Sequence, residues 1–430
     1  MGRKSAFEEP RCAKRGAQTA LETLYILYYH TFVFLRNTLL GILKDQRPPS
    51  PAGPEIARAV ASRIPAHPQH AVVLTGVRRA GKSILQSQLM RAKDGAFYLN
   101  LEDTRLFGLG PEDFPALLEV VEELAETKTV FLDEIQELPE WQRLVRSLLD
   151  RGHAVCVTGS NASLLRHELG SKLTGRHLSY EIFPFSYPEF LGYTGGQPGG
   201  STLRAFLDDG GFPGYLQRRD PRILQELLRD IVQRDIAQRH RLRESRHVMN
   251  LALFLLANTG RPVSLQSLTK TLGVPTVAGT SRYIEYLQDA YLLFAVPKYS
   301  ASFKKRVVAP AKYFAIDNGL RRVNSPQFTA DLGHRLENAV FLSLRERGAR
   351  VFYAAEKDKW ECDFVTDDLA VQVCAELTPF NRDRELTGLS HALKLPGSRR
   401  ALVVTLDQRD QLQLNGLPVD VVPAWDWFGR

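Results

Sequence analysis

The sequence predicts an α/β fold built on a parallel sheet covered by helices, and two observations support this prediction. From about Pro65 to Phe190, apolar runs of strand length alternate with segments of helical periodicity, which is typical of such a sheet. The first run, residues 71–76, leads into a glycine-rich turn, and three later runs end in polar residues: 96–103, 129–136 and 153–161. Because the carboxyl ends of parallel strands lie at one edge of a sheet, we expect a functional site at that edge.

The size and charge of the chain limit its class. With 430 residues, of which 44% are hydrophobic, it is long enough for two or three domains with proper cores, and this excludes wholesale disorder. Lys and Arg number 56 against 48 Asp and Glu, a net charge of +8, which suits a polyanion such as nucleic acid as well as simple solubility. Four cysteines without a CxxC pair, and no secretion signal, predict reduced thiols in a cytoplasmic protein.

The apolar segment Thr19–Lys44 tests that localisation. Its length approaches that of a membrane span, but Glu22, His30 and Arg36 interrupt it, and a span requires about 20 mostly apolar residues without charges. We therefore expect no integral membrane association. The segment is interpreted as an amphipathic helix that docks on its own protein or on a neighbouring subunit, with membrane association as the less favoured alternative.

A phosphate-binding loop follows the first strand. The stretch Gly76–Ser83, GVRRAGKS, matches GxxxxGK[ST] with a strand before it and a helix after it. In this motif the backbone amides converge on the phosphates, Lys82 neutralises the β and γ oxygens, and Ser83 ligates Mg²⁺. The residues expected to bind ATP are Gly76, Arg79, Ala80, Gly81, Lys82, Ser83 and Ile84.

A strand that ends in acidic residues supplies the second half of such a site. In VFLDEIQ, three apolar positions precede Asp133 and Glu134. Asp133 is expected to hold Mg²⁺ through water, and Glu134 to orient and deprotonate the attacking water. A solvated acidic strand end is the alternative, but the order and spacing of the two motifs favour ATP hydrolysis.

Three further residues are candidates for contact with the reacting phosphate. Ser160 and Asn161 follow the next strand in VTGSNASLL, where they can touch the γ-phosphate or serve as a helix N-cap. Arg176, after a glycine in LTGR, is either a surface arginine or one that stabilises the transition state in the ATP site of a neighbouring subunit.

Together these segments resemble a known family, the bacterial and archaeal AAA+ ATPases with a winged-helix region and a C-terminal nuclease-like domain. The resemblance spans roughly Arg58 to Val404 and rests on GVRRAGKS, FLDEIQEL, TGSNASLL, LTGR, PFSYPEF, GGFPGYL and RDIVQRDI, which occur in family order. It implies ATP hydrolysis, a homo-oligomer that completes the site between subunits, of which a hexamer is one form, and often a DNA-related role. It also implies Arg176 as a finger in trans, with Arg229 or Arg234 as alternatives.

The resemblance and the local patterns together divide the chain into five regions. The proline-dense stretch Asp45–Pro54 marks a linker. We expect an N-terminal helix and linker (1–54), an AAA+ P-loop core (55–200), a helical lid (201–247), a winged-helix region (248–325) and a degenerate PD-(D/E)xK nuclease-like α/β domain (326–430).

The segment Ser264–Phe294 has the pattern of a helix-turn-helix unit with a tight turn at Leu272–Val274. The candidate contacts to DNA phosphates are Arg282, on the second helix, and Lys304, Lys305 and Arg306, in the expected wing. Glu285 and Asp289 on the same helix would repel a phosphate backbone, so sequence-specific recognition is not expected, and a role as a protein spacer remains open.

The C-terminal region has the element order of a nuclease core, a helix with Glu337 and a strand with Asp363, but it departs from the motif. Gln372 stands where an acid is expected and Cys374 where the lysine is expected. An amide binds Mg²⁺ weakly, and a thiol cannot replace an ammonium beside a phosphate. Glu376 offers only a partial replacement, so we expect a scaffold rather than a nuclease.

These observations favour an assembled Mg²⁺- and ATP-dependent motor that remodels DNA, most plausibly branched or forked DNA in repair or recombination. The alternative from another class is a nucleotide-controlled switch that acts on protein partners in defence or signalling. A metal-dependent nuclease is the third interpretation.

Overall fold

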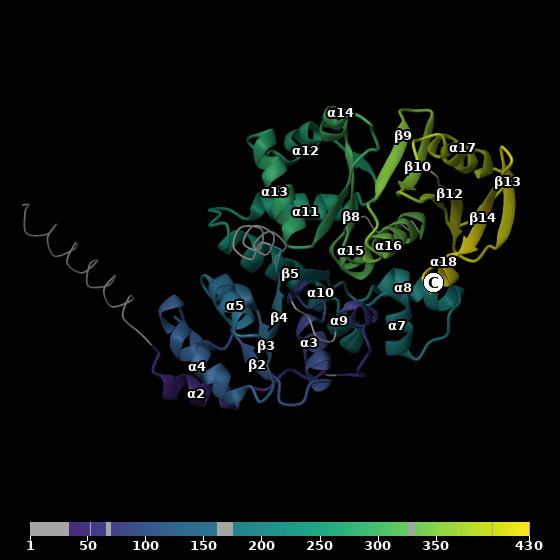
Figure 1. Cartoon of the computed structure of the whole chain (residues 1–430). Coiled ribbons are helices and arrows are strands. Elements are labelled where there is room, and N and C mark those ends of the chain that lie inside the picture. The colour runs from purple at the N-terminus through teal and green to yellow at the C-terminus, as the bar shows by residue number, and fades with distance from the viewer. Residues whose placement is uncertain are drawn as a thin grey trace, which may run out of the picture.

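A parallel sheet forms the centre of the N-terminal half of the computed structural model (Figure 1). The structure describes residues 34–51, 53–65, 70–160, 175–325, 332–397 and 399–429. The sheet has five strands in the order β2-β3-β4-β1-β5, and every neighbouring pair is parallel. Its strands are β1 (Ala71–Thr75), β2 (Phe97–Asn100), β3 (Thr129–Asp133), β4 (Ala154–Gly159) and β5 (His177–Glu181). The predicted α/β class with a parallel sheet is confirmed.

Alternate residues of these strands face two separate cores, because successive side chains of a strand point to opposite faces. One face, with Val73, Leu132 and Val157, packs against α2 (Arg36–Asp45), α4 (Phe114–Leu124) and α5 (Trp141–Asp150). The other face, with Val72, Phe131 and Cys156, packs with Leu85 of α3 (Lys82–Arg91) into the larger core of the molecule. Burial on both faces explains why these strands are continuous apolar runs.

Helix α2 is the described part of the predicted N-terminal helix, and it docks on its own protein. Leu39, Ile42 and Leu43 are buried against the core that contains α4, while residues 1–33 lie outside the described part of the chain. Among the described residues, no helix is both long and apolar enough to cross a membrane.

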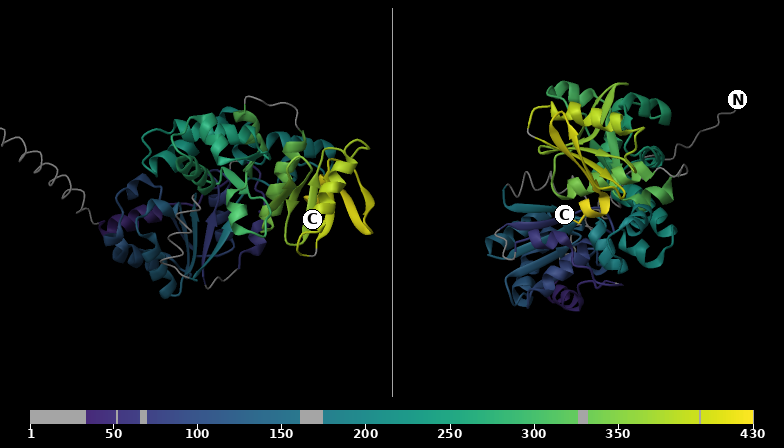
Figure 2. Two further views of the ribbon diagram at one scale, coloured as in Figure 1. Left: turned by 90° about the horizontal axis from the view of Figure 1, so that it is seen from above. Right: turned by 90° about the vertical axis from the view of Figure 1, so that its right-hand side faces the viewer.

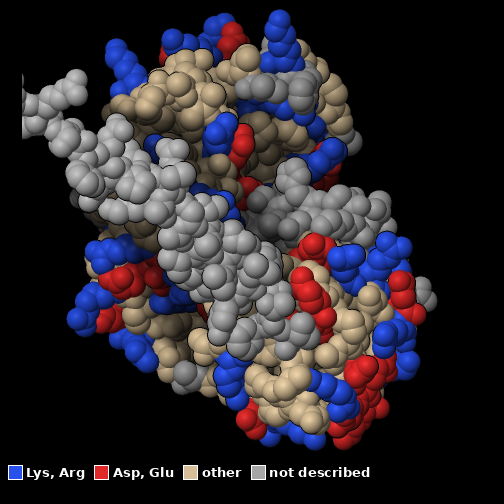
Figure 3. Space-filling model, turned by 90° about the vertical axis from the view of Figure 1, so that its left-hand side faces the viewer, with Lys and Arg blue, Asp and Glu red and all other residues tan. Residues whose placement is uncertain are grey.

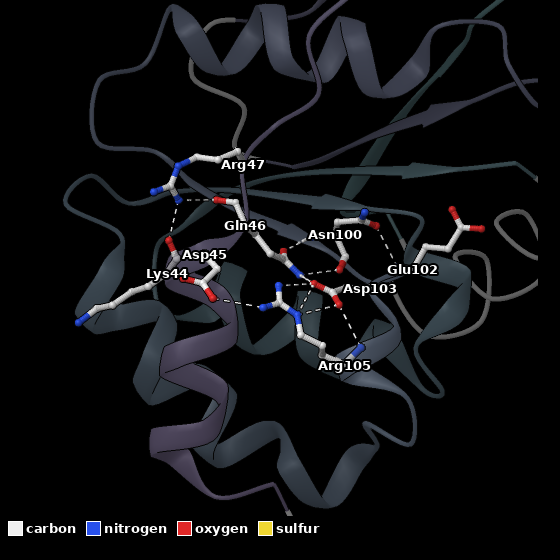
Figure 4. Close-up of polar contacts among 8 residues, drawn as sticks. All are labelled: Lys44, Asp45, Gln46, Arg47, Asn100, Glu102, Asp103 and Arg105. Carbon is white, nitrogen blue, oxygen red and sulfur yellow. Dashed lines mark hydrogen bonds and ion pairs between the residues drawn. The ribbon is translucent and has the colours of Figure 1, made fainter.

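The segment after α2 is fastened to the edge of the parallel sheet (Figure 4). The Gln46 side-chain amide donates to the carbonyl oxygen of Asn100 (3.1 Å) and to Asp103 (3.0 Å), and its oxygen accepts from the amide of Asn100 (2.7 Å). Arg105 pairs with Asp103 at 2.8 Å and with Asp45 at 3.2 Å. The segment that begins the proline-rich linker is therefore part of the ATPase-like core.

Helices make up the region that follows the parallel sheet. They are α7 (Tyr187–Thr194), α8 (Gly200–Asp209), α9 (Pro213–Arg218), α10 (Arg222–Asp230), a π-helical stretch (Ile231–Gln238) and α11 (Arg246–Ala257). Leu224, Leu227 and Leu228 of α10 are buried, which gives this helix one apolar face toward the larger core.

A small antiparallel sheet and a pair of helices follow α11. The sheet has the strand order β6-β8-β7, from β6 (Pro262–Val263), β7 (Leu293–Val296) and β8 (Ala311–Ala315), and the helices are α12 (Leu265–Leu272) and α13 (Val277–Asp289). Ser264 caps α12 by accepting from the amide of Ser267, and Gly273 ends it in the left-handed conformation, as the turn in the sequence predicts.

The connection between β7 and β8, where we expected a wing with Lys304 to Arg306, contains a short helix, α14 (Phe303–Val308). A run of basic residues without strand alternation in KKRVV gives no signal for a hairpin, which explains the difference.

The C-terminal region is a six-stranded mixed sheet with the order β13-β14-β12-β11-β10-β9. Its strands are β9 (Phe352–Glu356), β10 (Trp360–Val365), β11 (Leu369–Val373), β12 (Arg400–Thr405), β13 (Asp410–Leu414) and β14 (Leu417–Pro423). The accompanying helices are α15 (Asn318–Asn324), α16 (Leu332–Glu346), α17 (Arg382–Leu393) and α18 (Ala424–Trp427). In Figure 1 and in the left view of Figure 2, this sheet lies at the opposite end of the molecule from α2.

Candidate nucleotide site

The loop between β1 and α3 has the conformation that a phosphate-binding loop requires. Gly76 (φ +149°) and Gly81 (φ +97°) adopt positive φ angles, and so does Arg79 (φ +64°). A Cβ on Gly76 would lie 2.1 Å from the carbonyl oxygen of Ile182, so only glycine allows β1 to turn this closely past β5. The loop leads directly into the N-terminus of α3, where backbone amides and the helix dipole favour an anion.

Lys82 lies inside this loop, 4% exposed. Its Nζ donates to the carbonyl oxygens of Gly76 and Val77, both at 3.1 Å. Burial lowers the pKa of Lys82, and the neighbouring Glu134 and Asp133 oppose that shift. The ammonium is thus held at the loop by neutral carbonyl groups.

Asp133, at the end of β3, meets the loop and two other strands. Its Oδ1 accepts from Ser83 Oγ at 3.0 Å and from the Thr158 hydroxyl, and its Oδ2 accepts from the Tyr98 hydroxyl at 3.0 Å. Burial raises the pKa of Asp133, whereas these hydroxyl hydrogen bonds favour the charged form. The two sequence motifs, about 50 residues apart, are therefore brought together as predicted.

Glu134 is turned away from the strand by its own backbone. Its φ is +52°, and its amide donates to Thr158 Oγ1 at 2.9 Å. The side-chain amide of Gln136 donates to its carboxylate. Thr158, on β4, fixes both acidic residues, although the sequence reasoning overlooked it in favour of Ser160 and Asn161.

Those two candidates have different outcomes. Ser160 directly follows β4 and is 2% exposed, and its Oγ has no hydrogen-bond partner within the described ranges. A buried hydroxyl without a partner beside a phosphate loop has its donor available for a ligand oxygen. Asn161 lies outside the described residues.

A pocket of about 330 Å³ opens beside the loop and contains Arg79, Gly81, Lys82, Ser83, Ile84 and Glu134 in its lining. The rest of its wall includes Arg58 and Phe185 and two segments for which we predicted no binding role. These are the linker with the residue shortly after it (Ser50, Pro51, Gly53, Pro54 and Ile56) and the helical region (Tyr193, Pro213, Gly214 and Gln217). Prolines and a tyrosine make an apolar wall suited to a flat ring. The motif GGFPGYL was the only available signal for this wall.

Three arginines, of which Arg58 is buried, connect the loop to its surroundings. Arg58 is 6% exposed and donates to Glu189 Oε1 (3.0 Å) and to the carbonyl oxygens of Ala80 (3.0 Å) and Phe183 (2.6 Å). The loop arginines pair with the helical region, Arg78 with Asp235 at 2.9 Å and Arg79 with Asp230 at 2.9 Å. The Arg79 side chain therefore contacts the helical region while its residue lines the pocket.

The arginines considered as fingers lie on the surface. Arg176 pairs with Asp150 at 2.7 Å, and both side chains are about half exposed (43% and 53%). Its carbonyl oxygen accepts from the amide of Ala71, so it lies at the beginning of β1, at the sheet edge opposite the phosphate loop. Arg229 pairs with Glu226, and Arg234 lies 3.6 Å from Glu102.

The predicted DNA contacts are only partly exposed. Arg282 and Lys304 are exposed, whereas Arg306 donates to the carbonyl oxygen of Ser300 at 2.8 Å and lies over the Phe352 ring. The side chain of Lys305 lies outside the described part of the structure.

Glu337 and Asp363 do come together in the C-terminal region, but around a residue that the sequence reasoning missed. Lys312, from β8, lies within 3.5 Å of both carboxylates and of Glu361. Cys374 is buried at the end of β11 with a pKa that burial raises to about 12, so its thiol is protonated and unreactive at neutral pH. Glu376 is exposed.

Comparison with known proteins shows the family of the chain. Residues 68–191 match a family described as an AAA domain, and residues 201–328 match a domain of unknown function, DUF8612. An uncharacterized protein of Methanocaldococcus jannaschii is 30% identical over 400 residues, which cover 84% of this chain and 88% of that protein. The chain belongs to this AAA-domain family. An uncharacterized protein of Haemophilus influenzae is also similar to it, with 31% identity over 378 residues that cover 82% of this chain and 93% of that protein.

Solved structures with an AAA+ fold are more distant from this AAA-domain protein. A STAND protein with a tetratricopeptide repeat sensor from Pyrococcus horikoshii is 15% identical with a TM-score of 0.28, and the match covers 69% of this chain and 47% of that one. The chain thus spans about half the length of that structure. The replication initiator DnaA bound to AMPPCP and single-stranded DNA is 11% identical with a TM-score of 0.23, covering 53% of this chain and 85% of that one. With TM-scores this low, these likenesses carry no conclusion about this chain.

Proposed function

We propose that this AAA-domain protein is a Mg²⁺-dependent ATPase that works as a homo-oligomeric motor and remodels DNA. The observation that carries the ATPase part is the 3.0 Å hydrogen bond between Ser83 Oγ and Asp133 Oδ1. It joins the phosphate loop to the acidic strand end at a pocket large enough for a nucleotide.

The residues at the pocket fit ATP and Mg²⁺. Ser83 and Asp133 would hold the metal, since a hydroxyl and a carboxylate are the oxygen ligands that Mg²⁺ prefers, and the unpartnered hydroxyl of Ser160 supports a bound phosphate oxygen. When bound, Mg²⁺ supplies neutralisation of the charge on the phosphates. When ATP binds, the Lys82 ammonium would exchange its hydrogen bonds to the two loop carbonyl oxygens for contacts with the β- and γ-phosphate oxygens. Their negative charges would then balance the charge of the buried ammonium.

Glu134 takes the proton of the attacking water. Its left-handed backbone and the Thr158 hydroxyl hold the residue one position beyond Asp133, and Gln136 restricts its carboxylate. A base fixed in this way contributes about 10²–10⁴-fold to a hydrolytic rate.

Arg176 supports an oligomer in which one subunit completes the site of the next. Arg176 lies at the end of the sheet where the strands begin, and its own phosphate loop lies at the end where β1 finishes. Because a β-strand rises about 3.3 Å per residue, β1 separates the two by more than about 10 Å. Its exposed pairing with Asp150 is weak enough to exchange for a phosphate. A ring such as a hexamer brings this edge to a neighbour's pocket.

DNA as the substrate is supported by the unit from α11 to β8. We infer that this unit is a winged helix, because its elements follow the order α11-β6-α12-α13-β7-α14-β8 with an antiparallel sheet, and α14 lies in the connection between β7 and β8. Arg282 and Lys304 are its exposed candidate phosphate contacts. With Glu285 and Asp289 on the same helix, it is suited to DNA structure rather than sequence, which fits branched or forked DNA in repair or recombination. The C-terminal sheet is proposed as its nuclease-like scaffold.

A protein-directed nucleotide switch is the second candidate, and the ion pairs of the segment Arg218–His247, which is rich in arginine, favour it. Arg222 pairs with Asp220, Arg229 with Glu226 and Arg234 with Glu102. On the face drawn in Figure 3, basic and acidic residues are likewise intermingled. Arginines already paired with carboxylates offer less charge to a polyanion.

Steady-state ATP turnover against single-stranded, duplex, forked and four-way-junction DNA tests the proposal. Glu134→Gln is the blank, and Arg282→Ala with Lys304→Ala is the matched variant. We expect one DNA structure to stimulate wild-type turnover, with weaker stimulation in the matched variant and a steep loss of stimulation as salt rises. Equal turnover with and without every DNA contradicts the motor and supports the switch. No turnover in the wild type contradicts the ATPase itself.

A further inference from the structure

Lys312 lies at the centre of three carboxylates in the C-terminal half. Its Nζ is 2.8 Å from Glu337 Oε1, 2.6 Å from Glu361 Oε1 and 3.5 Å from Asp363 Oδ1. The Lys312 side chain is 2% exposed, against 10% for Glu337 and 17% for Asp363. An ammonium buried to this extent is stable only when carboxylates surround it.

The four charged groups come from three different elements. Lys312 belongs to β8 of the small antiparallel sheet, Glu337 to α16, and Glu361 and Asp363 to β10. The turn before β6 closes over them, because a Cβ on Gly260 would lie 2.8 Å from Glu337 Oε2. The cluster thus lies where the small sheet, α16 and the C-terminal sheet meet.

Gln372 closes the side of the cluster where a nuclease would have an acid. Its oxygen accepts from the amide of Asp363 (2.7 Å), and its amide donates to the carbonyl oxygen of Glu361 (3.1 Å) and to Glu385 Oε2 (2.8 Å). A carboxylate at this position would lose both donated bonds and face Glu385, a like charge. Gln372 therefore supports the strands around the cluster instead of extending the set of acids.

A nuclease centre on Glu337 and Asp363 needs Mg²⁺, and the residues present do not fit that ion. Mg²⁺ binds carboxylate oxygens at about 2.0–2.1 Å with nearly octahedral geometry. The Lys312 ammonium already lies within hydrogen-bond distance of Glu337 and Glu361. A metal ion at these oxygens would displace this buried ammonium and leave it with Asp363, at 3.5 Å, which weakens the pairing that keeps it stable.

We propose that Lys312 is the built-in cation of this cluster, filling the place of a divalent metal and fastening the small antiparallel sheet to the C-terminal sheet. The C-terminal half then keeps a carboxylate site without metal chemistry. This inference does not depend on ATP hydrolysis or on DNA, because none of its residues lines the nucleotide pocket.

The proposal predicts that removing the ammonium creates a divalent cation site. The experiment uses the nucleotide-free full chain, freed of metal by a chelator, with Mn²⁺ as the probe. Binding by calorimetry and the thermal unfolding midpoint with and without Mn²⁺ are compared in the wild type, Lys312→Met and Lys312→Met with Asp363→Asn. Lys359→Met is the matched control, since Lys359 pairs with Glu356 on the exposed turn between β9 and β10.

We expect Lys312→Met to unfold at a lower temperature than the wild type and to recover with Mn²⁺, binding about one more Mn²⁺ ion per chain. Adding Asp363→Asn should abolish both the extra Mn²⁺ binding and the recovery of the unfolding temperature. Lys359→Met should behave as the wild type. Any Mn²⁺ held by Ser83 and Asp133 is common to all variants and cancels in the comparison.

Two results overturn the proposal. One is a wild type that binds Mn²⁺ at a site lost in the single variant Asp363→Asn, because the carboxylates then accept a metal beside Lys312. The other is a folded Lys312→Met that gains no Mn²⁺. If Lys312→Met can be purified as a folded protein only in the presence of Mn²⁺, this dependence of its folding on the ion supports the proposal. The comparison of Mn²⁺ binding between the wild type and Asp363→Asn can still overturn it.

Discussion

Asp133 and Asp363 are both strand carboxylates withdrawn from water, but their surroundings differ in one respect. Asp133 is held by the hydroxyl groups of Ser83, Tyr98 and Thr158, whereas Asp363 shares an ammonium, Lys312, with two other carboxylates. Hydroxyl groups orient a carboxylate and leave its negative charge uncompensated, so the site still attracts a cation. The Lys312 ammonium places a positive charge among the three carboxylates, at the position a metal ion would take.

The remaining acids differ in the same way. Glu134 projects toward a pocket of about 330 Å³, where a substrate can reach it. Glu337 is buried, and burial raises its pKa to about 8 although Lys312 opposes the shift. Acidic residues thus form a candidate reaction site at Asp133 and Glu134, where the cation must come from solution. They form a structural contact at Glu337 and Asp363, where Lys312 is the cation.

The largest effect should come from removing the base on the Asp133 side. We expect Glu134→Gln to lower ATP turnover by about 10²–10³-fold, because the amide cannot take a proton from water, while nucleotide binding persists. Steady-state turnover and binding of a fluorescent ATP analogue measure the two quantities. Glu137→Gln, at an exposed acid in the next turn, is the control and should retain full turnover; an equal loss in both variants would count against Glu134 as the base.

A smaller effect is expected when one of the three hydroxyl donors is removed. Tyr98→Phe takes away a hydrogen bond to a charged group, worth about 1.5–3 kcal/mol, so turnover should fall by roughly tenfold and more Mg²⁺ should be needed for half-saturation. A Mg²⁺ titration of turnover measures both changes.

Tyr353→Phe sharpens this test at the other site. The Tyr353 hydroxyl donates to the carbonyl oxygen of Pro310 at 2.6 Å, near Lys312, and its loss should leave turnover and the Mg²⁺ requirement unchanged. If Tyr98→Phe also leaves both unchanged, the contact between Tyr98 and Asp133 does not position the metal ligand.

A third prediction concerns pH and the Glu337 side. Its pKa is raised from 4.5 to about 8 in the folded chain, so the folded state holds a proton that the unfolded state has released between these values. This contribution to stability is complete below pH 4.5 and is lost as pH rises through about 8, with a slope of about 1.4 kcal/mol per pH unit at most. Urea unfolding at several pH values should show the slope in the wild type.

Glu337→Gln provides the control for that slope. The glutamine carries no proton to release, yet its oxygen can still accept from Lys312, so the pH dependence between 5 and 8 should become flatter than in the wild type. A slope that is unchanged in Glu337→Gln would assign the dependence to other groups.

The sequence predicted the parts of the fold and of the candidate site that depend on local patterns. The phosphate loop Gly76–Ser83 and the pair Asp133–Glu134 are recognisable because each is a short motif with a strand beside it. The parallel sheet follows from apolar runs of strand length, since burial on both faces leaves no polar alternation.

The missed parts depend on which distant segments meet. Thr158 contacts both acidic residues, a role that the sequence did not assign to it, because only the pairing of β3 with β4 in space shows which hydroxyl meets Asp133. Lys312, in β8, lies 25 residues from Glu337, in α16, so no spacing rule connects them. The basic stretch from Lys304 was expected in a wing, but forms α14.

The amide of Gln46 has a consequence for the association of the sheet with other chains. β2 is an edge strand, and its inner side is bonded to β3, as the Leu101 amide donates to Asp133. The Gln46 side chain donates to and accepts from the backbone of Asn100 on the outer side, as an added strand would. Such edges otherwise recruit strands from other molecules and aggregate. A chain that lacks the residues up to and including Gln46 would therefore expose an aggregation-prone edge, and the first residues of the linker act as its cover.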